Sequence, residues 1–378
     1  MKVFVLILLL GMLVGCSSFS GSINAVSTVI PKEAVVKYSQ NKGLEDRFSN
    51  LYPTHCPQYP HTCEQDCYAP NKFIQCQAPK LAPNLAPKLA PMENCMFKQT
   101  QIKPNLDTGF KVKWLGHASF VIQTPDGQTL LIDPVFGQFD WPVNWAFRWS
   151  YGYDRKPPAT MPKSQLSAVD GVMYSHIHYD HFNKDDIRSI GTKAKYFTPL
   201  GFAEHFENHG YDITQMAWYA KQTLNDLTIH FVPAHHFSSR ILVPYIYEDD
   251  DKTLWGGWIV EYQGKKLFFA GDTGYSQHFK DIQAKYGDID VCLIPIASYY
   301  SQDNPVWYRY VHTTPEDSIN AASDLNCGVM IPWGYGNASW KMGDHTSHSA
   351  LFRLLNMYEQ LNTKTPLYIL NEGEEVKF

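Results

Sequence analysis

One stretch constrains the fold more than any other: an apolar run, Val169–Tyr174, leads directly into the sequence Ser-His-Ile-His-Tyr-Asp-His. The apolar run predicts a buried strand. His176 and His178 are two residues apart in extended chain, so their side chains point to the same side. Asp180 and His181 follow on the predicted turn. We expect the two imidazoles to bind one metal ion and the second pair to bind another, because four ligand-type residues rarely converge in a solvated polar loop.

The spacing His-x-His-x-Asp-His is also the signature of the metallo-β-lactamase superfamily. Four further segments resemble the branch of that superfamily that contains the N-acyl-phosphatidylethanolamine-hydrolysing phospholipase D. They are Trp-Leu-Gly-His-Ala-Ser (114–119), Asp-Pro-Val-Phe (133–136), Leu-Trp-Gly-Gly-Trp (254–258) and Gly-Asp-Thr-Gly-Tyr (271–275). The similarity runs in order from Phe110 to the C-terminus. It implies a zinc-dependent hydrolase with an α/β fold, the αββα sandwich.

The pattern of apolar residues supports this fold class, because hairpins followed by strand–helix alternation occur twice and favour two packed sheets with helices outside. We expect a helix capped by Thr314, with Asp317 three residues further on. A hairpin of two strands is predicted at 111–124 and 128–134, and a second hairpin group at 224–233 and 254–270. Further strands are predicted at 195–198, 289–297, 329–333 and 367–370, and helices at 184–190, 201–208, 276–286, 315–325 and 350–361.

The resemblance also indicates the remaining metal ligands. His236 aligns with the third imidazole of the first metal, and its neighbour His235 is the alternative. Asp272 lies between glycines after an apolar strand and aligns with the carboxylate that bridges both ions. Asp272 and Asp180 are therefore the expected catalytic carboxylates. Asp133 ends a strand and is expected to accept a hydrogen bond from a ligand histidine.

Candidate substrate-binding residues follow from the same comparison. His312 precedes a predicted helix, and we expect His312 and the first amides of that helix to hold a phosphate group, which also makes it a candidate catalytic residue. Tyr275, Tyr299 and Trp307 are candidates for lining the substrate cleft. The aromatic segment at 136–153 fits two interpretations equally, a small additional core or a lipid-facing lip.

One position departs from the branch. Where the branch usually reads His-Trp-Gly, this chain has Pro332 before Trp-Gly, and proline cannot bind a metal ion. His345 is the first candidate to replace the missing imidazole, and His348 is the second. The alternatives are a weakly held second zinc ion, a single-metal enzyme or a degenerate site.

The N-terminus reads as a bacterial lipoprotein signal peptide, 1–15, because a short apolar run ends in Leu-Val-Gly-Cys. This resembles a lipobox, which implies lipidation of Cys16 and, since no Asp follows, an outer-membrane lipoprotein on the periplasmic or cell-surface side. Residues 16–50 are predicted to be a tether. Residues 51–105 form a cysteine-rich extension with a proline every fourth residue, which favours extended chain. The hydrolase domain is expected at 106–378.

The eight cysteines fall into different groups. Disulfides are favoured over a zinc knuckle in the extension, because the expected compartment is oxidising. Cys292 and Cys327 lie in apolar segments and are predicted to be buried core thiols. The extension contains Cys56, Cys63, Cys67, Cys76 and Cys95.

The predicted function is a phospholipase D-type phosphodiesterase acting on N-acyl-phosphatidylethanolamine-like lipids through a metal-bound hydroxide. Zinc suits this reaction because it lowers the pKa of bound water to about 7. The partners are a phospholipid or other membrane lipid and, through the anchor, the membrane; a net charge of −5 does not indicate nucleic-acid binding. One alternative is a same-fold hydrolase of a soluble ester, lactone or phosphodiester. The other is a degenerate, non-catalytic surface-binding lipoprotein.

Overall fold

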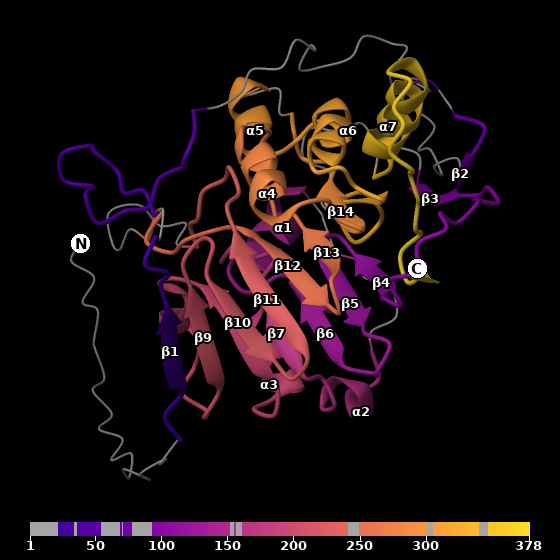
Figure 1. The fold of residues 1–378 in the computed structure, drawn as a ribbon. Helices are drawn as coiled ribbons and strands as arrows, with labels where there is room; N and C mark the ends of the chain where they lie inside the picture. The colour runs from indigo at the N-terminus through magenta and orange to yellow at the C-terminus, as the bar shows by residue number, and fades with distance from the viewer. Residues whose placement is uncertain are drawn as a thin grey trace, which may run out of the picture.

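Two β-sheets packed face to face form the centre of the molecule, and helices cover the outer faces (Figure 1). This computed structural model describes residues 22–33, 36–53, 69, 71–77, 93–151, 155, 161–240, 249–300, 305–339 and 347–378. The arrangement confirms the predicted αββα sandwich. The signal peptide, Cys16 and the proline repeat lie outside the described residues, as do Cys56, Cys63 and Cys67.

The first sheet has eight strands, which are parallel from β1 to β6 and antiparallel from β6 to β16. In spatial order they are β1 (Ala25–Val29), β9 (Asp212–Met216), β8 (Lys195–Pro199), β7 (Gly171–Met173), β6 (Thr129–Ile132), β5 (Ser119–Gln123), β4 (Lys111–Gly116) and β16 (Glu375–Lys377).

The second sheet has six strands, antiparallel up to β13 and parallel beyond it. In spatial order they are β10 (Lys221–Leu224), β11 (Leu227–Val232), β12 (Gly257–Tyr262), β13 (Lys265–Phe269), β14 (Val291–Pro295) and β15 (Val329–Trp333). A separate hairpin consists of β2 (Ile74–Gln77) and β3 (Glu93–Phe97).

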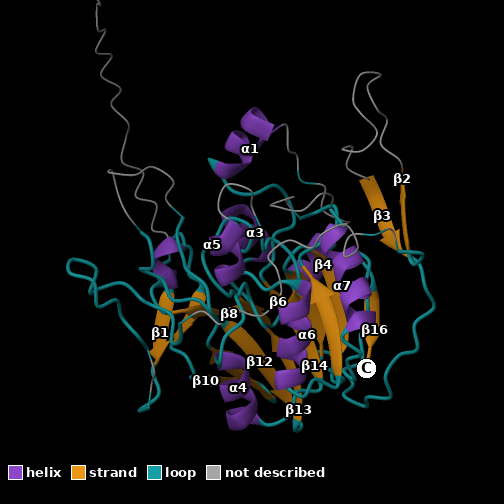
Figure 2. Ribbon diagram, turned by 90° about the horizontal axis from the view of Figure 1, so that it is seen from above, coloured by secondary structure: helices purple, strands orange, loops and turns teal. Residues whose placement is uncertain are grey.

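The helices lie outside the sheets, except for α1, which projects from the body of the molecule (Figure 2). α6 begins as predicted: the Thr314 side chain accepts from the Asp317 amide, and the Asp317 side chain accepts from the Thr314 amide. The helices are α1 (Val143–Tyr151), α2 (Lys163–Leu166), α3 (Lys184–Ile190), the 3-10 helix η1 (Phe202–His205), α4 (His278–Tyr286), α5 (Pro305–Val311), α6 (Pro315–Asp324) and α7 (Ser349–Gln360).

Alternation along the central strands explains the layers. Successive side chains of a strand point to opposite faces. In β7, Val172 belongs to the apolar cluster under α3, whereas Met173 belongs to the core between the sheets. In β8, Tyr196 and Phe197 divide in the same way. Because both faces of these strands are covered, consecutive apolar residues are buried in each, as expected for parallel strands inside a sheet.

Three predicted elements differ from the structure. The segment predicted as one strand at 111–124 is a hairpin, because Gly116 and His117 both have positive φ, 99° and 51°, and reverse the chain. The predicted helix at 201–208 is only the short 3-10 helix η1. The predicted strand at 367–370 forms a single bridge, between Leu367 and Met330.

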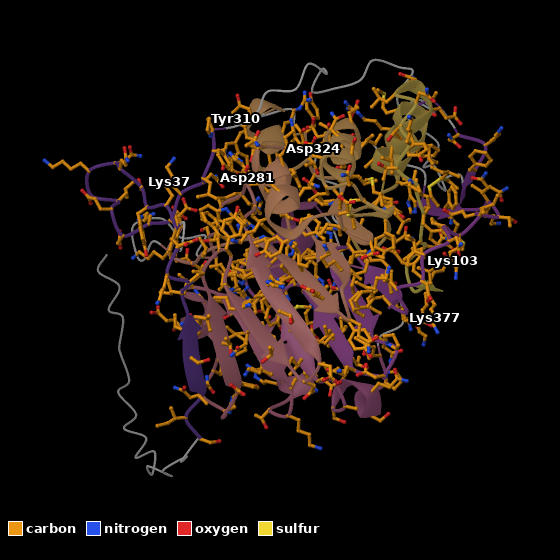
Figure 3. All side chains as sticks on the ribbon, viewed as in Figure 1. Lys37, Lys103, Asp281, Tyr310, Asp324 and Lys377 are labelled. Carbon is orange, nitrogen blue, oxygen red and sulfur yellow. A yellow bond between two sulfur atoms is a disulfide. The ribbon has the colours of Figure 1, made fainter. Side chains whose placement is uncertain are left out.

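The described part of the predicted tether is folded onto the domain. β1 pairs with β9, and the Asn24 side chain fastens its start: Oδ1 accepts from the amides of His209, Gly210 and Tyr211 at 3.0–3.1 Å. The strand was not predicted because its side chains are mostly exposed and carry no alternating apolar pattern. At the opposite edge of this sheet, Lys103 lies beside Lys377 and its Nζ donates to the Lys377 carbonyl oxygen (Figure 3). The boundaries predicted between signal peptide, tether, cysteine-rich extension and hydrolase domain stay predictions.

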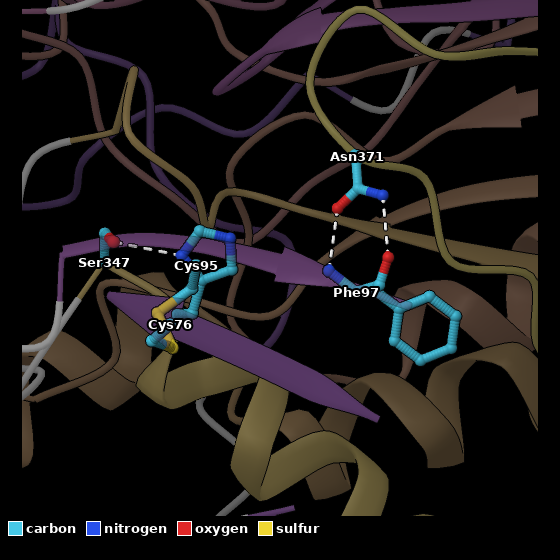
Figure 4. Close-up of a disulfide and its surroundings, with 6 residues drawn as sticks. Cys76, Cys95, Phe97, Ser347 and Asn371 are labelled. Carbon is cyan, nitrogen blue, oxygen red and sulfur yellow. Dashed lines mark hydrogen bonds between the residues drawn. A yellow bond between two sulfur atoms is a disulfide. The ribbon is translucent and has the colours of Figure 1, made fainter. Parts of the chain in front are cut away.

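Two disulfides occur among the described cysteines. Cys76–Cys95 links β2 to β3, which confirms a disulfide in the extension (Figure 4). The Asn371 side chain bonds both the amide and the carbonyl of Phe97, so the hairpin is fastened to the domain. Cys292 and Cys327 are buried, as predicted, but the prediction that they are free thiols was wrong, because they form a disulfide. Cys292 lies in β14 and Cys327 precedes the neighbouring strand β15, which brings their Cα atoms to 6.0 Å, within bonding range.

Candidate metal centre

The candidate centre is built at the ends of strands from both sheets. The segment with three histidines follows β7, His236 follows β11, and Asp272 follows β13. Gly271 has φ +65°, and a Cβ there would lie 2.5 Å from the Gly256 carbonyl oxygen. Only glycine allows these two loops to pack so closely, and this packing holds Asp272 against the segment that follows β7.

Three imidazoles converge on the first candidate metal position. His176 Nε2 lies 2.8 Å from His178 Nδ1, and His236 Nε2 lies 3.3 Å from the same atom. Burial lowers the pKa of all three rings, to about 4 for His178, so they are neutral at pH 7. Neutral imidazoles present lone pairs, as metal binding requires. The structure thus brings together these three predicted ligands. His235, the alternative to His236, bonds instead to the Tyr310 carbonyl oxygen at 2.8 Å.

Asp180 and His181 form the second candidate position together with His117. The Asp180 Oδ2 atom lies 3.7 Å from His181 Nε2 and 2.9 Å from His117 Nε2. Burial acts to raise the pKa of the Asp180 carboxyl, but His181 and His117 hold it below its ordinary value. Burial likewise opposes protonation of His181, yet Asp272, Asp180 and Asp133 raise the pKa of its ring. His181 therefore sits in a strongly negative environment.

Asp272 lies between the two positions. Its Oδ2 atom is 3.3 Å from His181 Nε2 and 4.0 Å from His236 Nε2. Although burial acts to raise the pKa of Asp272, His181 and His312 hold it well below its ordinary value, so the carboxylate is ionised. This placement agrees with the bridging role predicted for Asp272.

Hydrogen bonds at the outer ring nitrogens show that the residues fit metal ions. His181 Nδ1 donates to Asp133 at 2.7 Å, as predicted for Asp133, and His236 Nδ1 donates to the Val311 carbonyl at 2.9 Å. Ser175 donates to Asp133 and therefore accepts from His176 Nδ1. In the neutral form of each ring, Nε2 is thus left with a lone pair. His181 Nε2 is fully buried and has no hydrogen-bond partner among the described residues, an arrangement that a metal ion satisfies.

A residue from outside the predicted domain supports the first position. Asn50 Nδ2 donates to the His236 carbonyl at 2.8 Å, and Asn50 Oδ1 accepts from the His236 amide at 2.9 Å. The same oxygen accepts from the Trp255 indole at 3.0 Å. These contacts fix the backbone of His236 on both sides of its Cα atom.

His312 lies beside the centre, with Nε2 3.3 Å from Asp272 Oδ2. The expectation that the first amides of α6 bind the same phosphate was wrong. The Thr314 hydroxyl already accepts from the Asp317 amide, and Glu316 and Asp317 place two acidic residues in the first turn. Thr314 and these carboxylates, which pair with Arg353 and Arg309, already satisfy the helix start.

A cavity of about 360 Å³ opens onto the centre. Apolar side chains dominate its wall, and Trp307 is among them, as predicted. Tyr275 and Tyr299 are placed elsewhere, which corrects their prediction as cleft residues: the Tyr275 hydroxyl bonds to Asp324, and Tyr299 is fully buried. The cavity is lined by Phe139, Val143, His178, Tyr179, Asp180, Phe237, Ser239, Asp250, Asp272, Ser298, Trp307, Tyr308 and His312.

The structure also limits the candidates for the missing ligand. Pro332 is fully buried in β15 and offers no donor atom for a metal. His345, the first candidate, lies outside the described residues. His348 is buried before α7, where Nδ1 contacts Ser347 Oγ at 3.0 Å, and it belongs to none of the metal-type clusters in the described part of the chain. The structure does not support His348 as the replacement.

Two side chains that contact the site were not singled out from the sequence. His117 occurs in the Trp-Leu-Gly-His-Ala-Ser segment. A histidine is a common metal ligand, and its presence there could have indicated a role in the site. Asn50 carried no signal, because its partner His236 is 186 residues away in the chain.

A two-sheet sandwich with imidazoles and carboxylates gathered at the strand ends defines a metal-dependent hydrolase fold. Comparison with known families agrees: a profile described as "Beta-lactamase superfamily domain" matches residues 128–335, more than half of the chain. The chain therefore belongs to the metallo-β-lactamase superfamily.

Relatives within that superfamily carry different names. The uncharacterized protein Rv0906 of Mycobacterium tuberculosis is 31% identical over 268 residues, which cover 67% of this chain and 66% of the relative. The N-acyl-phosphatidylethanolamine-hydrolyzing phospholipase D 1 of Caenorhabditis elegans is 29% identical over 249 residues, 60% of this chain and 65% of the relative. The chain thus spans just under two thirds of each relative's length. The crystal structure of a possible metal-dependent hydrolase from Veillonella parvula superposes with a TM-score of 0.55 and 16% identity, covering 72% of this chain and 100% of that one.

Proposed function

We propose that the protein is a zinc-dependent, phospholipase D-type phosphodiesterase that acts on N-acyl-phosphatidylethanolamine-like lipids. The observation that carries this proposal is the apolar cleft that leads to the centre. Phe139, Val143, Phe237 and Trp307 line it next to Asp272. A soluble, highly charged substrate gains little from such walls, whereas an acyl chain is stabilised by them. The similarity to the worm phospholipase D supports the same substrate class.

The helix beside the cleft supports a membrane-bound substrate. α1 supplies Val143 to the cleft wall and exposes Trp145 and Trp149, at 58% and 79%, while Trp141 before it is 77% exposed. Of the two interpretations of this aromatic segment, the exposed indoles favour the lipid-facing lip, although Val135, Phe139 and Val143 form a small apolar cluster beneath it. Indoles are favoured at the interface between membrane and water. We infer that the lip contacts the bilayer that holds the substrate.

Each residue of the centre has a role in the proposed reaction that follows from its position. Zinc ions bound here would activate water for in-line attack on phosphorus and offset charge on the phosphate oxygens. His176, His178 and His236 would hold one ion, Asp180 and His181 would hold the other, and Asp272 lies where its carboxylate could contact both. His312 lies on the cleft wall beside Asp272, where its imidazole orients the phosphate group. The apolar wall excludes bulk water from the leaving head group.

Localisation belongs to the same proposal. A lipidated Cys16 would hold the protein on the outer membrane, so that lip and anchor act on one surface. No described helix is both long and apolar enough to cross a bilayer. Cys16→Ala should therefore release the protein into the soluble periplasmic fraction, as measured by fractionation after a high-salt wash. Continued sedimentation with membranes would contradict the anchor without bearing on catalysis.

The test of activity uses the full mature chain with added zinc and N-acyl-phosphatidylethanolamine in mixed micelles. Mass spectrometry should detect phosphatidic acid and N-acylethanolamine in equal amounts. Asp272→Ala should abolish product and metal binding while its circular dichroism stays unchanged, and Asp288→Ala, an exposed aspartate bonded to Asn326, is the matched control. Parallel arms contain a lactone, a soluble ester and a soluble phosphodiester. Turnover of a soluble substrate alone would replace the proposed substrate class, and metal binding without turnover of any would favour a binding protein.

A further inference from the structure

His117 occupies a costly backbone position at the centre. It lies at the turn between β4 and β5 with φ 51°, in the left-handed region that residues other than glycine rarely adopt. Such strain persists only where the surrounding structure imposes it, and it concentrates at functional sites. The imidazole is 3% exposed and lies against Asp180. The turn therefore holds a strained backbone conformation that places this ring at the second candidate metal position.

The hydrogen bonds of His117 determine which ring nitrogen carries the proton. Ser339 Oγ lies 3.0 Å from the Tyr335 carbonyl oxygen, to which only the hydroxyl can donate. The same Ser339 oxygen lies 3.0 Å from His117 Nδ1, so it accepts a hydrogen from that nitrogen. The neutral ring consequently has a lone pair on Nε2. That lone pair points at Asp180 Oδ2 from 2.9 Å, where two acceptors face each other.

Two acceptors at this distance need either a proton on His117 Nε2 or a metal ion bound to both atoms. We propose that His117 Nε2 is a protein ligand of the second metal ion, together with Asp180, His181 and the bridging Asp272. This inference rests on the proposed metal-dependent function and supplies the imidazole that Pro332 cannot provide.

His117 has the same arrangement as the imidazoles already assigned to the centre. His176, His181 and His236 each donate Nδ1–H to an oxygen acceptor and turn Nε2 towards the other ligands. Metal-binding histidines show this pattern because the outer hydrogen bond fixes the tautomer and the ring orientation. Ser339 performs for His117 the task that Ser175 performs for His176.

The distances suit one small divalent ion. Ligand atoms at about 2.0–2.1 Å from a metal are roughly 2.9 Å apart at right angles and roughly 3.4 Å apart in a tetrahedron. The Asp180 Oδ2 atom lies 2.9 Å from His117 Nε2 and 3.7 Å from His181 Nε2, so small side-chain movements close the shell. Two imidazoles with two carboxylates match the preferences of zinc and related first-row ions, and they exclude the all-oxygen sites of calcium.

The experiment measures zinc stoichiometry by elemental analysis of the full mature chain after loading with zinc chloride and gel filtration. His117→Gly is the principal variant, because glycine adopts the φ of this turn without strain and so protects folding. Wild type should hold about two zinc ions per chain and His117→Gly about one, since the three-histidine position is untouched. His348→Ala, which removes a buried histidine outside the centre, should keep the wild-type value.

A second variant separates a ligand from a residue that only orients Asp180. His117→Asn tolerates the left-handed turn and can donate an amide hydrogen to Asp180, but it lacks the imidazole nitrogen, and its neutral carbonyl oxygen is a poor ligand for zinc. We expect it to lose the second ion as His117→Gly does, and its cobalt(II)-loaded form to lose part of the visible absorption. Two tightly bound ions in either variant, or one ion in the wild type, would overturn the assignment. Zinc stoichiometry is measured without a lipid substrate. If the variants lose the second ion but the wild type hydrolyses no lipid, the assignment of His117 stands and the proposed substrate class fails.

Discussion

Replacing Asn50 with alanine should weaken the first metal position without touching a ligand. Asn50 makes three hydrogen bonds, two to the backbone of His236 and one to the Trp255 indole. Each is worth about 1 kcal/mol net, so the variant should lose about 3 kcal/mol of unfolding free energy. The backbone of His236 would then lose the contacts that set the direction of its imidazole. Supporting partners of metal ligands typically contribute 10–100-fold to affinity, and we expect a loss of zinc affinity in that range.

The matched control is Asn24→Ala. Asn24 is also a partly buried asparagine of the N-terminal segment, and it fastens β1 through bonds to Glu207, His209, Gly210 and Tyr211. Its loss should lower the unfolding free energy by a similar amount but leave zinc affinity unchanged. Urea unfolding of the metal-free chains gives the first quantity, and competition with a chromophoric chelator gives the second. If Asn50→Ala and Asn24→Ala bind zinc equally well, the reasoning about His236 is wrong.

Three further predictions concern other parts of the molecule. The predicted boundaries suggest that a chain beginning at Gln101 will fold and bind zinc. Because this chain lacks β1 and Asn50, we expect it instead to be poorly soluble and to bind zinc weakly. A product that is monomeric on gel filtration and binds zinc fully would contradict this. Burial raises the pKa of Asp186 from 3.8 to about 6, so its contribution to stability is present below pH 3.8 and lost as the pH rises through 6. In urea titrations Asp186→Asn should remove that pH dependence. At pH 7.5 its free energy of unfolding should exceed that of the wild type by about 3 kcal/mol. Replacing Trp145 and Trp149 with serine should slow the hydrolysis of N-acyl-phosphatidylethanolamine embedded in phospholipid vesicles while leaving zinc stoichiometry at the wild-type value.

The sequence was sufficient for the local part of the site. The histidine-rich segment and its preceding strand lie within about a dozen residues, and Asp272 is marked by adjacent glycines, so ligand type and backbone direction can be read together. The fold class was predictable for a related reason, because buried strands and capped helices leave their pattern in neighbouring residues. α6 is an example, with Thr314 and Asp317 in the expected capping positions.

Contacts between distant segments were not predictable. Ser339 is 222 residues from His117, and Asn50 is 186 residues from His236, so no spacing rule connects them. The tyrosines failed for a different reason: an aromatic side chain fits a cleft and a core equally well until the direction of its backbone is known. Tyr299 points into the core and Trp307 into the cleft, although both precede the same helix α6. For Cys292 and Cys327, apolar context was visible but the adjacency of β14 and β15 was not.

The strand β1 affects how separate copies of the chain can pair with one another. It covers the outer edge of β9, whose backbone hydrogen-bonding groups would otherwise be open to pairing. Its exposed side chains add little to the core, so its contribution is made almost wholly through the backbone. The same pairing is available from any other copy of the chain, since β1 carries the register within its own five residues. By pairing with β9 itself, the β1 of each molecule keeps the β1 of a neighbouring copy from taking this place.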